Sequence, residues 1–123
     1  MSYTIQDVES WLGDAAGEID TDTKGEIAVA WDRVREAASA EFGGEAEQVA
    51  TEALTVAAMY LLGDTTVRKQ ERAYARACRA AEQAKMELRG AMIAADVRGE
   101  QMSRIAAEAG VTRATAYAWV RRV

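Results

Sequence analysis

Apolar residues recur every three or four positions along most of the chain, the spacing that gathers them on one face of an α-helix. The first such run follows Thr4, which stands three residues before Asp7 as a helix cap does before an acidic residue, and the run ends near Gly17. The second run follows a predicted capping box of Thr23 and Glu26 and ends at a pair of glycines. Two amphipathic helices are therefore predicted in the first third of the chain.

The next segment, residues 45–62, carries apolar residues on more than one face. This pattern predicts a helix buried at the centre of a bundle or covered by a second subunit. A long helical run then begins near Thr65 or Thr66 and meets no strong breaker before Gly99. Gly90 is the one candidate for an interruption, and the sequence leaves open whether the helix breaks there.

Composition fits helices throughout, because the apolar residues are mostly Ala, Val, Leu, Ile and Met, and proline is absent. We therefore expect an all-α protein. The three tryptophans at 11, 31 and 119 stand at core spacings and are predicted hydrophobic anchors, and Cys78 is predicted to be a small packing residue. A lone cysteine and the lack of an N-terminal apolar run lead us to expect a cytoplasmic protein with no membrane partner.

Charge divides the chain into two halves of opposite sign. Residues 1–62 hold 13 acids and 3 bases, whereas residues 63–123 hold 7 acids and 12 bases. A basic surface attracts phosphate and an acidic one repels it, so the second half is the candidate nucleic-acid face. We predict an acidic helical bundle over 1–64 that serves oligomerisation or interaction, a basic linking helix over 65–86, and a DNA-binding unit over 87–123.

Four cations share one face of the predicted linking helix. Their spacings of three, four and three residues bring them into line. Two interpretations stay open: a solvated helix face, or a stripe that follows DNA phosphates beside the main binding element. The four residues are Lys69, Arg72, Arg76 and Arg79.

The last two dozen residues carry the strongest functional pattern. Ile105 and Ala106 supply a buried anchor and a small residue where two helices cross. Gly110 permits the left-handed backbone needed to leave one helix and turn sharply, Val111 fills the turn, and Thr112 caps the next helix. We expect the side chains of Ala116, Trp119 and Val120 to face the core.

This pattern resembles the helix-turn-helix of the Hin recombinase and resolvase type, and more broadly the three-helix units of bacterial and phage repressors. The resemblance covers residues 87–122 and is strongest over 105–117, where the Ile-Ala pair, the glycine and the capped Arg-x-Thr-x-Tyr segment fall at the family's spacing. It implies that residues 112–122 form the helix that enters the major groove of double-stranded DNA. The implied base or groove contacts are Arg113, Ala114 and Tyr117, and the implied phosphate contacts are Thr112, Thr115, Arg121 and Arg122. Ala118 and Arg104 complete the predicted DNA-binding residues.

Recombinase activity does not carry over, because the residues that precede this unit show no catalytic-domain pattern. The resemblance therefore favours a sequence-specific transcriptional regulator, a repressor of bacterial or phage type, that acts as a homo-oligomer with a dimer preferred. Two alternatives stay open. One is a DNA-packaging or recombination accessory factor like a phage terminase small subunit, and the other is a protein-interaction adaptor that works through the acidic bundle.

Catalysis and metal binding find little support in the sequence. There is no histidine for acid-base work or metal ligation, so no enzyme, cofactor or metal site is expected. Residues 20–27 resemble the start of an EF-hand calcium loop. The match fails because Lys24 and Trp31 stand where oxygen ligands are needed, and a capped turn between helices is preferred.

Overall fold

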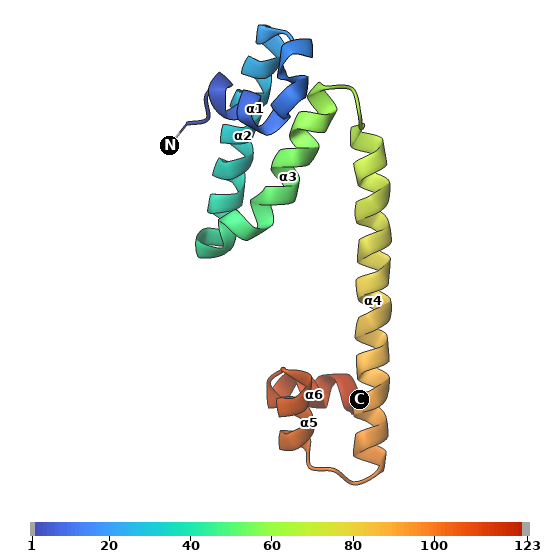
Figure 1. Cartoon of the computed structure of the whole chain (residues 1–123). Coiled ribbons are helices and arrows are strands. Elements are labelled where there is room, and N and C mark those ends of the chain that lie inside the picture. Colours follow the sequence, from blue (N-terminus) through green and yellow to red (C-terminus); the bar gives the residue numbers. More distant parts are fainter. Residues whose placement is uncertain (1, 122–123) are drawn as a thin grey trace. The chain divides into compact units, whose positions relative to one another are not determined.

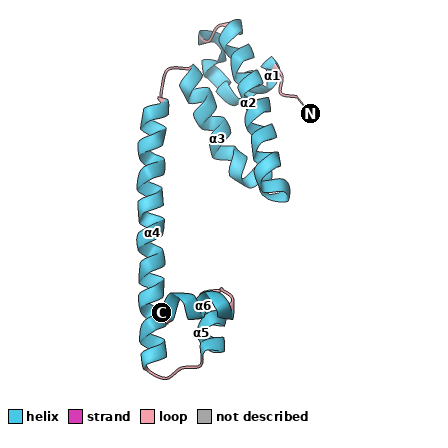
Figure 2. Ribbon diagram, turned by 180° about the vertical axis from the view of Figure 1, so that it is seen from behind, coloured by secondary structure: helices cyan, strands magenta, loops and turns pink. Residues whose placement is uncertain are grey.

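The computed structural model describes residues 2–121, and within that range the fold is all-α, without a strand (Figure 2). The chain divides into two compact units, residues 1–70 and 71–123, and the division falls inside one helix. Each unit is described by itself. The elements in chain order are α1 (Ile5–Leu12), the 3-10 turn η1 (Gly13–Glu18), α2 (Thr21–Phe42), the 3-10 turn η2 (Gly43–Glu45), α3 (Ala46–Leu61), α4 (Val67–Val97), α5 (Met102–Ala109) and α6 (Arg113–Val120).

The start of α1 is the one predicted. Thr4 and Asp7 form a capping box in which the Thr4 hydroxyl accepts from the Asp7 backbone N–H at 3.2 Å and the Asp7 carboxylate accepts from the Thr4 backbone N–H at 2.8 Å. The end of α1 comes earlier than expected. Gly13 adopts a φ of 62°, which ends the α-helix, and a 3-10 turn takes the place of the last predicted turn up to Gly17.

The predicted capping box of Thr23 and Glu26 is wrong, because α2 begins at Thr21. Asp20 is the cap, and its carboxylate accepts a hydrogen bond from the Thr23 backbone N–H at 2.7 Å. Hydrogen bonds from Thr23 also lower the pKa of this carboxyl. The segment that resembles a calcium loop is thus helical from Thr21 onward.

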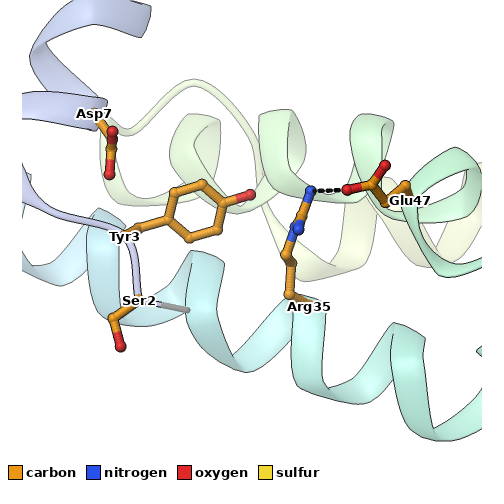
Figure 3. A pocket seen from close by; sticks show the side chains of 5 residues that line it. All are labelled: Ser2, Tyr3, Asp7, Arg35 and Glu47. Atoms are coloured by element: carbon orange, nitrogen blue, oxygen red, sulfur yellow. Dashed lines mark hydrogen bonds and ion pairs between the residues drawn. The ribbon is translucent and has the colours of Figure 1, made fainter.

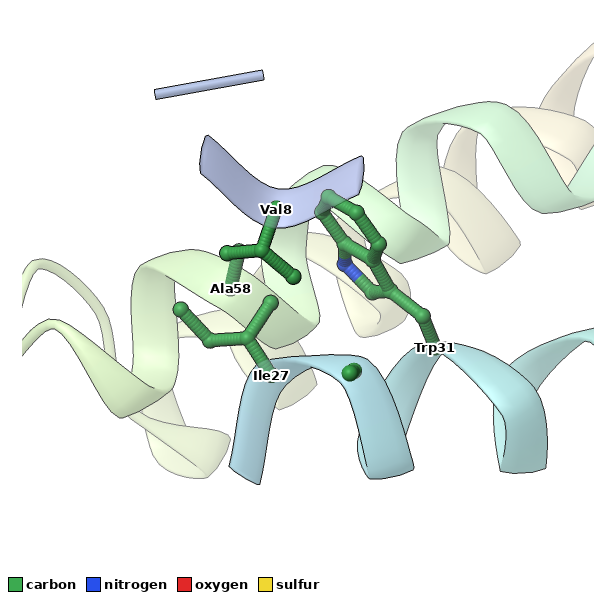
Figure 4. Close-up of a cluster of buried hydrophobic side chains, with 5 residues drawn as sticks. Val8, Ile27, Trp31 and Ala58 are labelled. Carbon is green, nitrogen blue, oxygen red and sulfur yellow. The ribbon is translucent and has the colours of Figure 1, made fainter. Parts of the chain in front are cut away.

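The core of the first unit lies between α1, α2 and α3 (Figure 4). Trp31 is buried there, and its indole N–H donates to the Leu54 carbonyl oxygen at 2.8 Å. Tyr3 and Trp11 contact Trp31 edge-on, with ring centroids 5.1 Å and 5.7 Å away. Trp31 is therefore the predicted anchor, whereas the prediction for Trp11 is wrong: its side chain is 44% exposed because it lies over the outside of Trp31. The buried residues are Val8, Ile27, Ala28, Trp31 and Ala58.

Helix α3 is not central. Only Ala50 and Ala58 are buried in it, while Val49 and Tyr60 are 41% and 52% exposed. The interpretation of α3 as a helix buried inside the bundle is wrong, since α1 and α2 pack on one side of it only. Burial of its other side by a second subunit remains a prediction.

Helix α4 is a single helix that runs through Gly90 without a break, which answers the question that the sequence leaves open. Thr66 caps it by accepting from the Lys69 backbone N–H at 3.1 Å. Cys78 is exposed on α4, so the prediction of a packed cysteine is wrong. Across the described residues, α4 and the other helices are either too short or too polar to cross a membrane.

Candidate nucleic-acid interface

The second unit is a three-helix arrangement in which α5 and α6 pack against the C-terminal half of α4 (Figure 1). Met92 is the only buried residue of α4 and faces Ile105 of α5 and Ala116 of α6. Ile105, Ala106 and Ala116 occupy the core as predicted, and Trp119 and Val120 pack against it half-buried. The small side chains at 106 and 116 allow two short helices to cross closely over one methionine.

The turn between α5 and α6 has the geometry that its sequence predicts. Gly110 adopts a left-handed conformation, φ 71° and ψ 28°, and its backbone N–H donates to the Ala107 carbonyl oxygen at 3.3 Å. The N–H of Val111 donates to the Ala106 carbonyl oxygen at 3.1 Å, and the Val111 side chain packs against the core. Residues with a Cβ rarely adopt this backbone conformation, so glycine is strongly favoured here.

Thr112 caps α6 as predicted. Its hydroxyl oxygen accepts from the Thr115 backbone N–H at 3.1 Å and lies 3.0 Å from the Thr115 hydroxyl. The helix itself covers Arg113–Val120, slightly less than the 112–122 expected for the groove-binding helix. Cap, turn and core together fix the angle at which α6 leaves α5.

One side of α6 faces away from the core and is exposed. It carries a guanidinium at the first turn, a tyrosine one turn later, and small alanines between them. Small residues let the helix backbone approach another surface closely, while the long ones reach outward. These exposed residues are Arg113, Ala114, Tyr117, Ala118 and Arg121, and Thr115 at the edge is half-buried.

Arg121 forms an ion pair that the sequence does not predict. Its guanidinium reaches both carboxylate oxygens of Asp96 on α4, at 2.6 Å and 3.2 Å, and lies 5.5 Å from the centroid of the Tyr117 ring. The hydrogen bond from Arg121 lowers the pKa of Asp96, and the same bond raises the pKa of Arg121. This arginine therefore braces α6 against α4.

Two further basic residues of α4 hold the C-terminal end of α6. Arg89 donates from Nε and Nη2 to the Trp119 carbonyl oxygen at 3.4 Å and 3.3 Å, where the helix leaves carbonyls without internal partners. Lys85 lies 5.1 Å from the centroid of the Trp119 ring. Neither role was predicted, because the contacts of Arg89 span 30 residues of sequence.

The other predicted contacts fall in different places. Arg104 is exposed on α5 and pairs with Glu108 one turn away at 3.3 Å, an exposed pair that leaves the guanidinium accessible. Arg122 lies outside the described residues. The stripe of Lys69, Arg72, Arg76 and Arg79 is exposed along α4, and no ion pair involves it within residues 2–121.

The first unit carries a separate hollow of about 250 Å³ beside the N-terminus of α1 (Figure 3). Arg35 crosses it, donating to Glu47 at 3.1 Å and lying 5.7 Å from the Tyr3 ring centroid. The Nε of Arg35 is buried without a hydrogen-bond partner. Since the charged groups around this hollow largely engage one another, it adds no surface that attracts phosphate. Its lining is Ser2, Tyr3, Asp7, Arg35 and Glu47.

Comparison of the chain with protein-family models, with curated proteins and with solved structures finds no match.

Proposed function

We propose that this protein binds double-stranded DNA through its second unit, with α6 as the helix that enters the major groove, and that it acts as a sequence-specific transcriptional regulator of the repressor type. The observation that carries the proposal is the geometry around Gly110 and Thr112. A left-handed glycine followed by a threonine cap orients α6 with one side buried and the other exposed. That is the arrangement a helix needs to insert into a groove without unfolding its own core.

The exposed residues of α6 fall into two groups, proposed base contacts and proposed phosphate contacts. Arg113 has the planar fork that recognises guanine edges, Tyr117 adds a ring with a polar end, and Ala114 and Ala118 permit close approach. Thr112 and Thr115 stand at the helix N-terminus, where hydroxyls and backbone N–H groups favour phosphate. Arg104, Arg121 and Arg122 are the proposed outer phosphate contacts, and Arg121 would have to share its guanidinium with Asp96.

Charge supports the same assignment. The half of the chain that contains this unit is net positive, whereas the first 62 residues hold ten more acids than bases. The acidic first unit repels the phosphates of DNA, so we expect the second unit to be the surface that approaches them. We further propose that the protein works as a homodimer, because two short recognition helices on a symmetric site add their contacts.

The test is a fluorescence-anisotropy titration of a randomised labelled duplex with the full chain at about 50 mM and about 200 mM salt. We expect affinity to fall steeply with salt, as displacement of counterions from phosphate requires. Selection of bound sequences from the same pool should then return one preferred site. Absence of binding at both salt concentrations would refute the proposal, and binding without any preferred sequence would refute the regulator.

A further inference from the structure

The basic stripe of α4 forms a continuous ridge. Its four members are Lys69, Arg72, Arg76 and Arg79, called the α4 ridge from here on, and they span about 15 Å at about 1.5 Å per residue. All four are exposed, and none belongs to an ion pair within the described part of the chain. Four unpaired cations in line repel one another, so an anionic partner would stabilise them.

The α4 ridge faces away from α5 and α6. A residue advances by about 100° around an α-helix, which places the ridge residues roughly 140° to 160° away from Met92, on the far side of α4. Three α4 side chains that contact α6 lie within about 60° of the Met92 direction: Lys85 and Arg89 at Trp119, and Asp96 at Arg121. Figure 1 shows α5 and α6 together on one side of α4.

Within residues 69–79 of α4 the one acidic residue is Glu71, which falls roughly 60° from the Met92 direction. Beyond the ridge, Glu82 follows Arg79 by three residues, and Glu87 lies about two turns after Arg79 on the ridge side of the helix. No acidic residue therefore interrupts the α4 ridge. Opposite charges four residues apart stabilise an ordinary solvent-exposed helix face. The α4 ridge contains no such pair, because all four of its members are cations.

The α4 ridge and the α4 side chains that hold α6 thus point in nearly opposite directions from the helix axis. We propose that the α4 ridge binds a second segment of double-stranded DNA, and that the protein thereby bridges two duplexes. The inference rests on the proposed function of α6. The length of the ridge corresponds to about four base-pair steps along the axis of a duplex, at about 3.4 Å each.

Two measurements on the full chain test this proposal. The first is anisotropy of one short labelled duplex that holds a single preferred site. The second is capture of a labelled duplex by another duplex immobilised on beads, in the presence of protein. The variant is the double substitution Arg72→Glu and Arg76→Glu. It should lower capture about tenfold or more at low salt while changing single-site affinity less than about threefold, because two charges of the second contact are reversed.

The matched control is Arg33→Glu, compared with Arg76→Glu alone. Arg33 is exposed on α2, so both variants change the net charge equally and differ only in position. Arg33→Glu should capture like the unmodified protein. A dimer could also join two duplexes through its two α6 helices, but the ridge variants leave α6 intact and would then capture normally.

Three results would overturn the bridging function. Normal capture by the double variant would show that the α4 ridge holds no second duplex. An equal loss in both assays would show that ridge and α6 contact the same duplex. Loss of capture on adding unlabelled RNA, with single-site binding unchanged, would assign the ridge to RNA. Failure of the unmodified protein to bind any duplex at low salt is different, because it would remove the proposed function first.

Discussion

Asp96 near the end of α4 and Arg121 at the end of α6 are joined by two hydrogen bonds, at 2.6 Å and 3.2 Å, across 25 residues of sequence. The pair connects the helix proposed to enter DNA with the helix that supports it. Because the Arg121 guanidinium also lies 5.5 Å from the Tyr117 ring centroid, the same contact orients an exposed aromatic side chain of α6.

Replacing Asp96 with Asn should make the second unit less stable at neutral pH and should have no such effect in acid. The hydrogen bond from Arg121 lowers the pKa of Asp96, so the folded state binds a proton less readily than the unfolded chain. Its contribution is therefore present above the unfolded value of about 3.9 and is lost as pH falls through the lowered pKa. Urea unfolding followed through the NMR signal of the Trp119 indole should show a difference between the two proteins at pH 7 that disappears in acid. A difference that persists unchanged at low pH would contradict this role of the ion pair.

Replacing Arg113 with Ala should relax sequence preference at one base-pair position of the selected site. Loss of a forked contact to a base edge costs about 1–3 kcal/mol of discrimination at that position. Arg104→Ala is the matched control, because this exposed arginine of α5 is a proposed phosphate contact and should weaken binding to all sequences alike. Selection from a randomised pool with each variant measures the difference. Identical effects on every sequence would show that the division into base and phosphate contacts is wrong.

Replacing Thr112 with Ala should destabilise the second unit by about 1 kcal/mol, because the Thr115 backbone N–H loses its acceptor. Thr112→Ser keeps a hydroxyl at the same place and should retain most of the stability. Chemical denaturation of the three proteins, followed through signals of the second unit, tests the cap. Equal stability of the alanine and serine variants would show that the hydroxyl contributes nothing to α6.

Replacing Gly90 with Ala should stabilise α4 by roughly 0.5–1 kcal/mol, since glycine inside a helix costs conformational entropy. A Cβ at this position meets no atom within 4 Å. Gly110→Ala is the opposite case, because a φ of +71° strains any side chain, and it should lower stability. Thermal unfolding monitored by circular dichroism distinguishes them. A loss of stability in the Gly90 variant would show that α4 needs flexibility at that point.

Sequence patterns predicted those features that short-range rules control. The αL glycine at 110, the cap at 112 and the buried Ala116 depend on neighbours within a few residues, and all three are where the pattern puts them. The start of α2 was mispredicted because Asp20 competed with Thr23 as a cap, and both residue types serve that role. The contacts of Asp96 with Arg121 and of Arg89 with Trp119 could not be predicted, since they join residues that only the packing of three helices brings together.

Because α4 continues unbroken through Gly90, it sets the rotational phase between the α4 ridge and the side that carries α6. Each residue added or removed between Arg79 and Lys85 would rotate the α4 ridge by about 100° relative to the side of α4 that carries α6. One insertion would bring the ridge toward the flank of the three-helix unit, and a whole number of turns would restore the opposed arrangement. Under the proposed bridging of two duplexes, the number of residues in this stretch of α4 would matter as much as the identity of the arginines on either side of it.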